Sequence, residues 1–176
     1  RLSRRNAELQ ALLDYVPEPK SKYIATRVIG DAGGVFIRSM LLNAGKREGV
    51  AKGQVVVNGV GLVGRITAAG NRSARALLIT DLNSRVPVMA ETSRDRAILT
   101  GDNGPLPRLV FLPTNSSIKP GDRILTSGHG GMFPPALAVG EVVSAGKGGV
   151  RVRPYAALDR LEFVRVIGYQ GVAQMT

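Results

Sequence analysis

Glycine and proline interrupt the apolar segments of this chain at short intervals, and that punctuation constrains its fold more than any other feature. The 176 residues include 22 Gly and 10 Pro. After Tyr23, runs rich in Val, Ile and Leu last only a few residues before a turn-forming residue follows, which is typical of short strands. We therefore predict an all-β protein, a sandwich or a barrel. The expected strands are residues 23–30, 35–43, 53–58, 61–69, 75–81, 85–92, 96–101, 108–113, 122–127, 138–146, 150–155 and 161–169.

The first sixteen residues follow a different pattern. Leu2, Leu9 and Val16 recur every seven residues, and Leu12 or Leu13 supplies the intermediate apolar position, as in a coiled-coil heptad. A helix of about 16 residues is marginal alone in water. It is therefore either the end of a longer coiled coil or a helix docked on the domain. Because the chain starts in the helical pattern and without Met, we favour the end of a self-associating coiled coil.

Two segments half a chain apart resemble each other. Lys52-Gly53-Gln54 precedes a strand, a Gly turn and Gly64-Arg65-Ile66, whereas Pro120-Gly121-Asp122 precedes a strand, a longer Gly turn and Gly140-Glu141-Val142. The repeated hairpin predicts two β-domains of like design, the second with a longer hairpin loop. We expect a helix at 1–16, a Pro-rich linker at 17–22, a first β-domain at 23–85, a second at 86–170 and a tail at 171–176.

Composition narrows the chemistry. The chain has no Cys and one His, which excludes disulfides, thiolate metal sites and cysteine catalysis. Its carboxylates are scattered, so no metal-ligand spacing is visible. The glycine-rich run at Gly59–Gly64 is followed by an expected strand, whereas a phosphate-binding loop needs a helix there. We accordingly predict neither a metal nor a cofactor.

The formal net charge of +11 favours acidic partners, such as nucleic acid, anionic lipid or an anionic cell-wall polymer. A solvated basic surface explains the same charge equally well. A basic β-barrel that binds nucleic acid is one alternative function. We do not favour it, because eight Phe and Tyr residues in all are few for a base-stacking platform.

The second alternative is a trypsin-like double-barrel serine hydrolase, suggested by Ser127 and His129 in a glycine-rich turn. A nucleophile needs a base within hydrogen-bond reach, oriented by a third group. Catalytic serine and histidine usually come from different segments, and no G-x-S-x-G elbow is present. We therefore predict that the protein is not an enzyme. In the same loop, Met132, Phe133 and Leu137 are candidate partner contacts, because apolar groups beside Gly and Pro can stay exposed. The alternative is that Phe133 plugs the end of its own barrel.

The repeated hairpins also carry a family resemblance. The first reads Asn43-x-Gly45, Gly49-Val50, Gly53, Val56-Val57 and Gly61-Leu62-Val63-Gly64-Arg65-Ile66. The second reads Pro120-Gly121-Asp122, Thr126-Ser127-Gly128, Gly130-Gly131, Phe133-Pro134, Leu137, Val139-Gly140 and Val142. Together with Asp81 and Ser84 between them, these motifs resemble the rod shape-determining protein MreC family over essentially the whole chain. The motif glycines carry over as structural turn residues, not as contacts.

The resemblance implies two six-stranded β-barrels, arranged as in chymotrypsin-like proteases but without a catalytic triad, behind a coiled coil. It also implies an extracytoplasmic, periplasmic domain anchored to the inner membrane by an N-terminal span, which we expect upstream of residue 1. The implied function is a non-enzymatic scaffold of the cell-elongation (rod) complex. Its expected partners are further copies of itself, the elongation transpeptidase penicillin-binding protein 2, MreD, RodZ and MreB, with no nucleic acid.

Overall fold

The computed structural model describes residues 22–31 and 37–168. The predicted helix at 1–16, with Leu2, Leu9, Leu12, Leu13 and Val16, lies outside these residues, as do most of the linker and the tail. All twelve predicted strands are present, with ends shifted by a few residues. They are β1 (Lys22–Asp31), β2 (Ser39–Leu42), β3 (Val55–Val57), β4 (Leu62–Ala69), β5 (Ala74–Leu78), β6 (Arg85–Ala90), β7 (Arg96–Thr100), β8 (Arg108–Val110), β9 (Arg123–Thr126), β10 (Ala138–Gly146), β11 (Gly149–Pro154) and β12 (Phe163–Gly168). Two short 3₁₀ turns, η1 (Lys46–Glu48) and η2 (His129–Gly131), join them.

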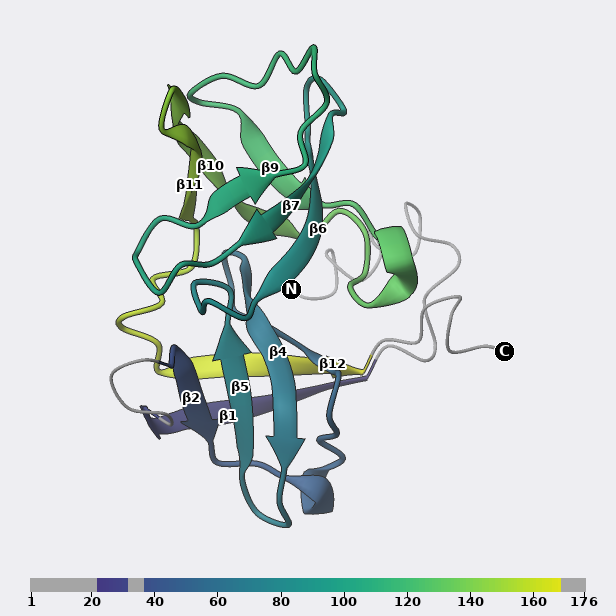
Figure 1. Ribbon diagram of the computed structural model, residues 1–176. Coiled ribbons are helices and arrows are strands. Elements are labelled where there is room, and N and C mark those ends of the chain that lie inside the picture. Colours follow the sequence, from purple (N-terminus) through teal and green to yellow (C-terminus); the bar gives the residue numbers. More distant parts are fainter. Residues whose placement is uncertain (1–21, 32–36, 169–176) are drawn as a thin grey trace, which may run out of the picture.

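The strands form two closed six-stranded antiparallel barrels, one above the other in Figure 1. The second barrel contains β6 to β11, and the first contains β1 to β5 together with β12. The predicted second domain at 86–170 is therefore wrong at its far end, because β12 belongs to the first barrel. There it lies between β1 and β3, and Val164 and Val166 are buried in the first barrel's core.

The two barrels share one plan, as the repeated hairpins predicted. Gly53 donates its N–H to Ile66 at 2.9 Å, and Gly121 donates to Val142 at 2.8 Å. β4 bulges between Ile66 and Ala68 where it pairs with β5, and β10 bulges at the matching place, between Val142 and Ser144, where it pairs with β11. In cyclic order β12 occupies the place in the first barrel that β6 has in the second. The barrels are thus related by a circular permutation.

The same equivalence extends to the turn before each hairpin. The side chain of Gln54 accepts the N–H of Ala51 at 2.8 Å, and the carboxylate of Asp122 accepts the N–H of Lys119 at 3.0 Å. Gly53 and Gly121 both have left-handed backbone angles, with φ of 94° and 96°, a region that favours glycine. The repeated Gly-Gln and Gly-Asp pairs therefore specify one local structure twice.

A continuous apolar core joins the barrels. Val56 of β3 points into the first barrel, whereas its neighbours Val55 and Val57 pack with the interior of the second. All three are buried, because successive strand residues face opposite sides and both sides are covered. Leu62 and Ile79 extend the same contact. The outer wall of the first barrel is thus part of the second barrel's core.

Two glycines predicted to form turns lie within strands. Gly64 is in β4 and Gly140 is in β10, and a Cβ on either would run into the backbone carbonyl of the neighbouring strand, at Leu77 or Arg153. We expect Gly140→Ala to lower the free energy of unfolding by about 1–3 kcal/mol, the usual cost of overpacking. Chemical denaturation would measure it.

Gly146→Ala, near the end of the same strand, is the matched control. A Cβ at Gly146 meets nothing within 4 Å, so this variant should be close to wild type. Equal stability of the two variants would contradict the close-packing role assigned to Gly140.

Candidate partner-binding surfaces

The loop between β9 and β10 is folded by its own polar contacts. The hydroxyl of Thr126 donates to the carbonyl of Pro134 and accepts the N–H of Leu137 at 2.8 Å. The backbone N–H of Ala136 also returns to the carbonyl of Thr126, at 2.8 Å. Because Thr126 is fully buried, these bonds fix the base of the loop against the barrel.

Ser127 and His129 form a turn in this loop. The Ser127 hydroxyl oxygen accepts the backbone N–H of His129 at 3.2 Å, a local bond typical of serine before a short helical turn. Gly128, Gly130 and Gly131 all have positive φ here, and the ring of Pro135 packs against Gly128. The Ser127 hydroxyl, which suggested a nucleophile, thus accepts a hydrogen bond from the first backbone N–H of η2.

The structure separates the three predicted contact residues. Phe133 is 2% exposed and packs in the core of the second barrel. The prediction that it contacts a partner is therefore wrong, and the alternative that it fills its own barrel is correct. Leu137 is half-buried against the same core. Met132 is 47% exposed, so it is the member of the set whose side chain is available to a partner.

The predicted structural glycines otherwise fall into two groups. Left-handed backbone angles occur at Gly49, Gly53, Gly121, Gly128, Gly130 and Gly131. Close backbone approach occurs at Gly45, which lies against Gly70 and Ser73, and at Gly61, which lies against Ala138 of the second barrel. Gly61 therefore places the short hairpin loop of the first barrel directly beside the start of β10.

Asp81 organises the junction between the barrels. Its carboxylate is 1% exposed and accepts the N–H of Arg38 at 2.6 Å and that of Asn83 at 2.7 Å. Across the junction, the Asn103 side chain accepts the N–H of Leu82 at 2.8 Å, and the Asn103 carbonyl accepts Arg38 Nε at 3.0 Å. A buried carboxylate thus ties the segment that leads into β2 to the connection between the two barrels.

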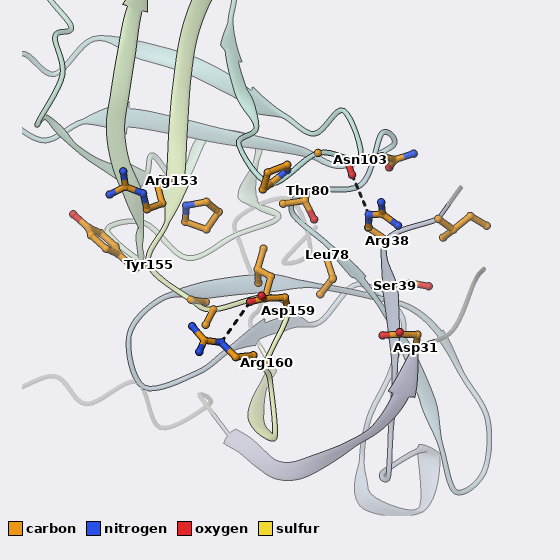
Figure 2. Close-up of a pocket in the computed structure, with 17 residues that line it drawn as sticks. Asp31, Arg38, Ser39, Leu78, Thr80, Asn103, Arg153, Tyr155, Asp159 and Arg160 are labelled. Carbon is orange, nitrogen blue, oxygen red and sulfur yellow. Dashed lines mark hydrogen bonds and ion pairs between the residues drawn. The ribbon is translucent and has the colours of Figure 1, made fainter. Parts of the chain in front are cut away.

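A cleft of about 690 Å³ opens beside this junction (Figure 2). One side carries Asp31, Arg38 and Ser39 of the first barrel, and the opposite side carries Arg153 and Tyr155. Its described lining includes serine but no histidine or lysine. Histidine and lysine are the usual bases for a serine nucleophile, and neither is among the described residues of this cleft.

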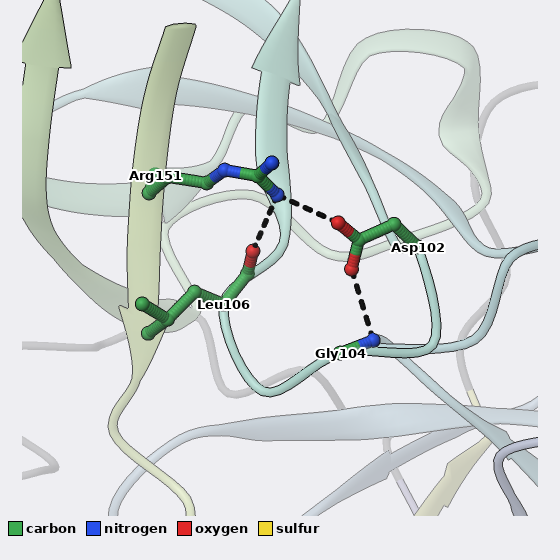
Figure 3. Close-up of polar contacts among 4 residues, drawn as sticks. All are labelled: Asp102, Gly104, Leu106 and Arg151. Carbon is green, nitrogen blue, oxygen red and sulfur yellow. Dashed lines mark hydrogen bonds and ion pairs between the residues drawn. The ribbon is translucent and has the colours of Figure 1, made fainter. Parts of the chain in front are cut away.

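An ion pair holds the loop between β7 and β8 against β11 (Figure 3). Arg151 Nη1 lies 2.7 Å from Asp102 Oδ2 and also donates to the Leu106 carbonyl at 3.0 Å. The other carboxylate oxygen, Oδ1, accepts the N–H of Gly104 at 2.9 Å. The hydrogen bond from Arg151 lowers the pKa of Asp102 below its ordinary value, and the Gly104 N–H acts in the same direction.

On the outside of the second barrel, Arg123 lies over the ring of Tyr155, 5.8 Å from its centroid, and pairs with Glu91 at 3.2 Å. Arg123 Nε donates to the Tyr155 hydroxyl at 3.2 Å, and this bond raises the pKa of Arg123. Sequence patterns did not single out this cluster or the Asp102 pair, because their members are distant along the chain. Asp81 was visible in the sequence only as a motif residue, without a role.

Taken together, these features define a class: a double β-barrel whose barrels share one apolar core, with a cleft between them whose described lining contains no histidine or lysine. The family model described as "Rod shape-determining protein MreC, barrel core" matches residues 28–168. This chain belongs to the MreC family. It is 44% identical over 94% of its length to the cell shape-determining protein MreC of Cereibacter sphaeroides, and 38% identical over 99% to that of Caulobacter vibrioides.

The chain spans about half the length of these relatives, covering 55% and 50% of them. Among solved structures, MreC from Pseudomonas aeruginosa is similar with a TM-score of 0.78 and 29% identity, over 84% of this chain and 99% of that one. A structure described as the complex between Penicillin-Binding Protein (PBP2) and MreC from Helicobacter pylori shares the fold, with a TM-score of 0.65, 20% identity and coverage of 84% and 98%. Within residues 22–31 and 37–168, no helix has the length and apolar character needed to cross a membrane.

Removing the Asp81 carboxylate should destabilise the protein. Asp81→Ala leaves the N–H groups of Arg38 and Asn83 without their acceptor, and we expect a loss of about 2–4 kcal/mol in unfolding free energy. Thermal or urea unfolding would measure it. Asp159→Ala is the control, because that carboxylate is 84% exposed and its loss should cost less than about 0.5 kcal/mol. Similar losses in both variants would contradict the junction role.

The Asp102–Arg151 pair should contribute stability that depends on pH. Because folding lowers the pKa of Asp102, the contribution is present above the unfolded-state pKa of about 4 and is lost as pH falls through the folded-state value. At neutral pH we expect Asp102→Asn to cost about 0.5–1 kcal/mol, since both partners are partly exposed to solvent. A double-mutant cycle with Arg151→Gln, measured at pH 7 and pH 3, isolates the pair. A coupling energy that persists unchanged at pH 3 would refute this assignment.

Proposed function

We propose that this chain is the extracytoplasmic part of a non-enzymatic scaffold in the cell-elongation (rod) complex, and that its barrels bind the elongation transpeptidase, penicillin-binding protein 2. The observation that carries the proposal is the apolar core that joins the two barrels into one unit. The described lining of the cleft beside it contains neither histidine nor lysine. Support comes from membership in the MreC family and from the described complex of PBP2 with MreC from H. pylori.

The mechanism that suits such a structure is geometric. Two barrels that share a core form one rigid unit, so a partner bound across them meets surfaces with fixed spacing. A scaffold of this kind activates an enzyme by binding its active conformation more tightly than its inactive one, with about 1–3 kcal/mol of coupling as the usual scale. No chemical step by the scaffold itself is required.

Further parts of the proposal concern the rest of the complex. Self-association through Leu2, Leu9, Leu12, Leu13 and Val16 follows from their heptad spacing and remains a prediction, as do assembly with MreD, RodZ and MreB and anchoring to the inner membrane. A periplasmic location is supported by a similar solved structure, described as the major periplasmic domain of the cell shape-determining filament MreC. That structure is 23% identical to this chain.

Binding to the transpeptidase ectodomain tests the central proposal. We expect a dissociation constant of about 10 µM or tighter, in the range of transient regulatory contacts, measured by biolayer interferometry with the ectodomain from the same organism. The Asp81→Ala variant is a useful companion, since loosening the barrel junction should weaken a contact that spans both barrels. No binding by the folded wild-type protein would count against the scaffold.

The hydrolase alternative has its own readout. A fluorophosphonate probe reacts with an activated serine, so the scaffold proposal expects no labelling of Ser127 above the level of a Ser127→Ala variant. If the probe labels the wild type stoichiometrically and Ser127→Ala abolishes the labelling, the protein is a serine hydrolase and the scaffold proposal is wrong.

A further inference from the structure

The outer face of β6, β7 and β8 carries an apolar row across three strands. Pro87 of β6 lies opposite Ile98 of β7, and Ile98 lies opposite Val110 of β8. All three side chains are half-buried, while the residues that alternate with them fill the barrel interior. Since paired residues on one face sit within about 5.5 Å of each other, the three side chains form a continuous strip.

Arginines flank this strip on both sides. On one side, Arg85 lies opposite Thr100, and Thr100 lies opposite Arg108. On the other side, Arg96 lies opposite Met89. The arginines at the three positions are exposed, and β6, β7 and β8 contain no Asp or Glu. The neighbouring carboxylate of Asp102 is already paired with Arg151.

Phe111 follows directly after the strip. Its side chain is 83% exposed, and its backbone is left-handed, with φ of 61°. An aromatic residue in this conformation is uncommon, and its backbone is strained. Because the side chain is exposed, burial does not offset this strain.

We propose that this face, which we call the arginine-flanked strip (Arg85, Pro87, Met89, Arg96, Ile98, Arg108, Val110 and Phe111), docks a segment of a partner protein that carries carboxylates beside apolar side chains. Arginine and aromatic residues are enriched in protein interfaces and dominate their binding energy. Apolar groups of the partner cover the strip, and its carboxylates meet the guanidinium groups on both sides.

Charge selects this occupant over a second copy of the chain. A symmetric contact between two such faces would bring arginines against arginines, with no carboxylate in these three strands to separate them. The chain as a whole is also basic, with 24 Lys and Arg against 13 Asp and Glu. An acidic partner surface satisfies the arginines, whereas another copy does not.

The inference rests on the proposed function, because the partner it assigns to the strip is the transpeptidase ectodomain. Three variants of the chain test the strip separately from the proposed function. Phe111→Gly removes the ring and relieves the left-handed backbone, which glycine adopts freely. The double variant Arg96→Glu/Arg108→Glu reverses charge on both sides of the strip. Phe163→Ser is the control, because Phe163 is an aromatic residue of the first barrel that is 66% exposed.

We expect Phe111→Gly to melt at the wild-type temperature or above it, while its affinity for the ectodomain falls about tenfold, as for a moderate hot spot. The charge-reversed variant should lose at least about tenfold and lose the salt dependence of the wild type. Phe163→Ser should bind as the wild type does. Biolayer interferometry at two salt concentrations and differential scanning fluorimetry supply these readouts.

Each other outcome has a defined meaning. If the wild type binds the ectodomain and both strip variants bind it with the same affinity, the inference is overturned but the proposed scaffold function is not. Absent binding by the wild type overturns both. A different result is that the wild type binds vesicles of anionic phospholipid while the strip variants do not. If the variants also keep their affinity for the ectodomain, the strip binds a membrane and the inference is overturned. Self-association that these variants abolish, again with ectodomain affinity unchanged, assigns it to a second copy and also overturns it.

Discussion

The rest of this structure depends on one shared apolar contact. Val55 and Val57 belong to the wall of the first barrel, yet they are part of the second barrel's core. The core of the second barrel is therefore completed by side chains of the first, and the relative position of the barrels follows from core packing rather than from a linker. The buried Asp81 and the close approach of Gly61 to Ala138 then fix the remaining freedom at the junction. Surfaces on both barrels are presented at a constant spacing.

The sequence was sufficient for the strands and for the repeat, because both are local properties. Turn glycines, short apolar runs and the matching motifs around Gly53 and Gly121 specify hairpins through backbone conformation alone. It was insufficient for the place of β12, since hydropathy does not say which neighbour a strand pairs with. Phe133 shows the same limit at a single residue: an apolar side chain in a Gly- and Pro-rich loop is compatible with either exposure or burial, and only the path of the loop decides.

The polar clusters were invisible in the sequence for a related reason. Asp102 meets Arg151 across 49 residues, and Arg123 meets Tyr155 across 32, so no spacing rule relates them. Apart from Phe111, which follows β8, the arginine-flanked strip is instead built from residues at alternate positions of three strands, a period-two pattern that the sequence contains. It becomes a surface only when the register aligns the strands, because a shift of one residue would turn the arginines into the core.

The return of β12 to the first barrel also orders the way this chain can fold. The second barrel is made of one uninterrupted segment, from β6 to β11, whereas the first must wait for a strand that comes more than 70 residues after β5. During synthesis from the N-terminus, β1 and β3 therefore each have one unpaired edge until β12 has been made. The inserted barrel can close earlier, and its core is then ready to receive Val55 and Val57. Closure of the first barrel becomes the late, long-range step of folding.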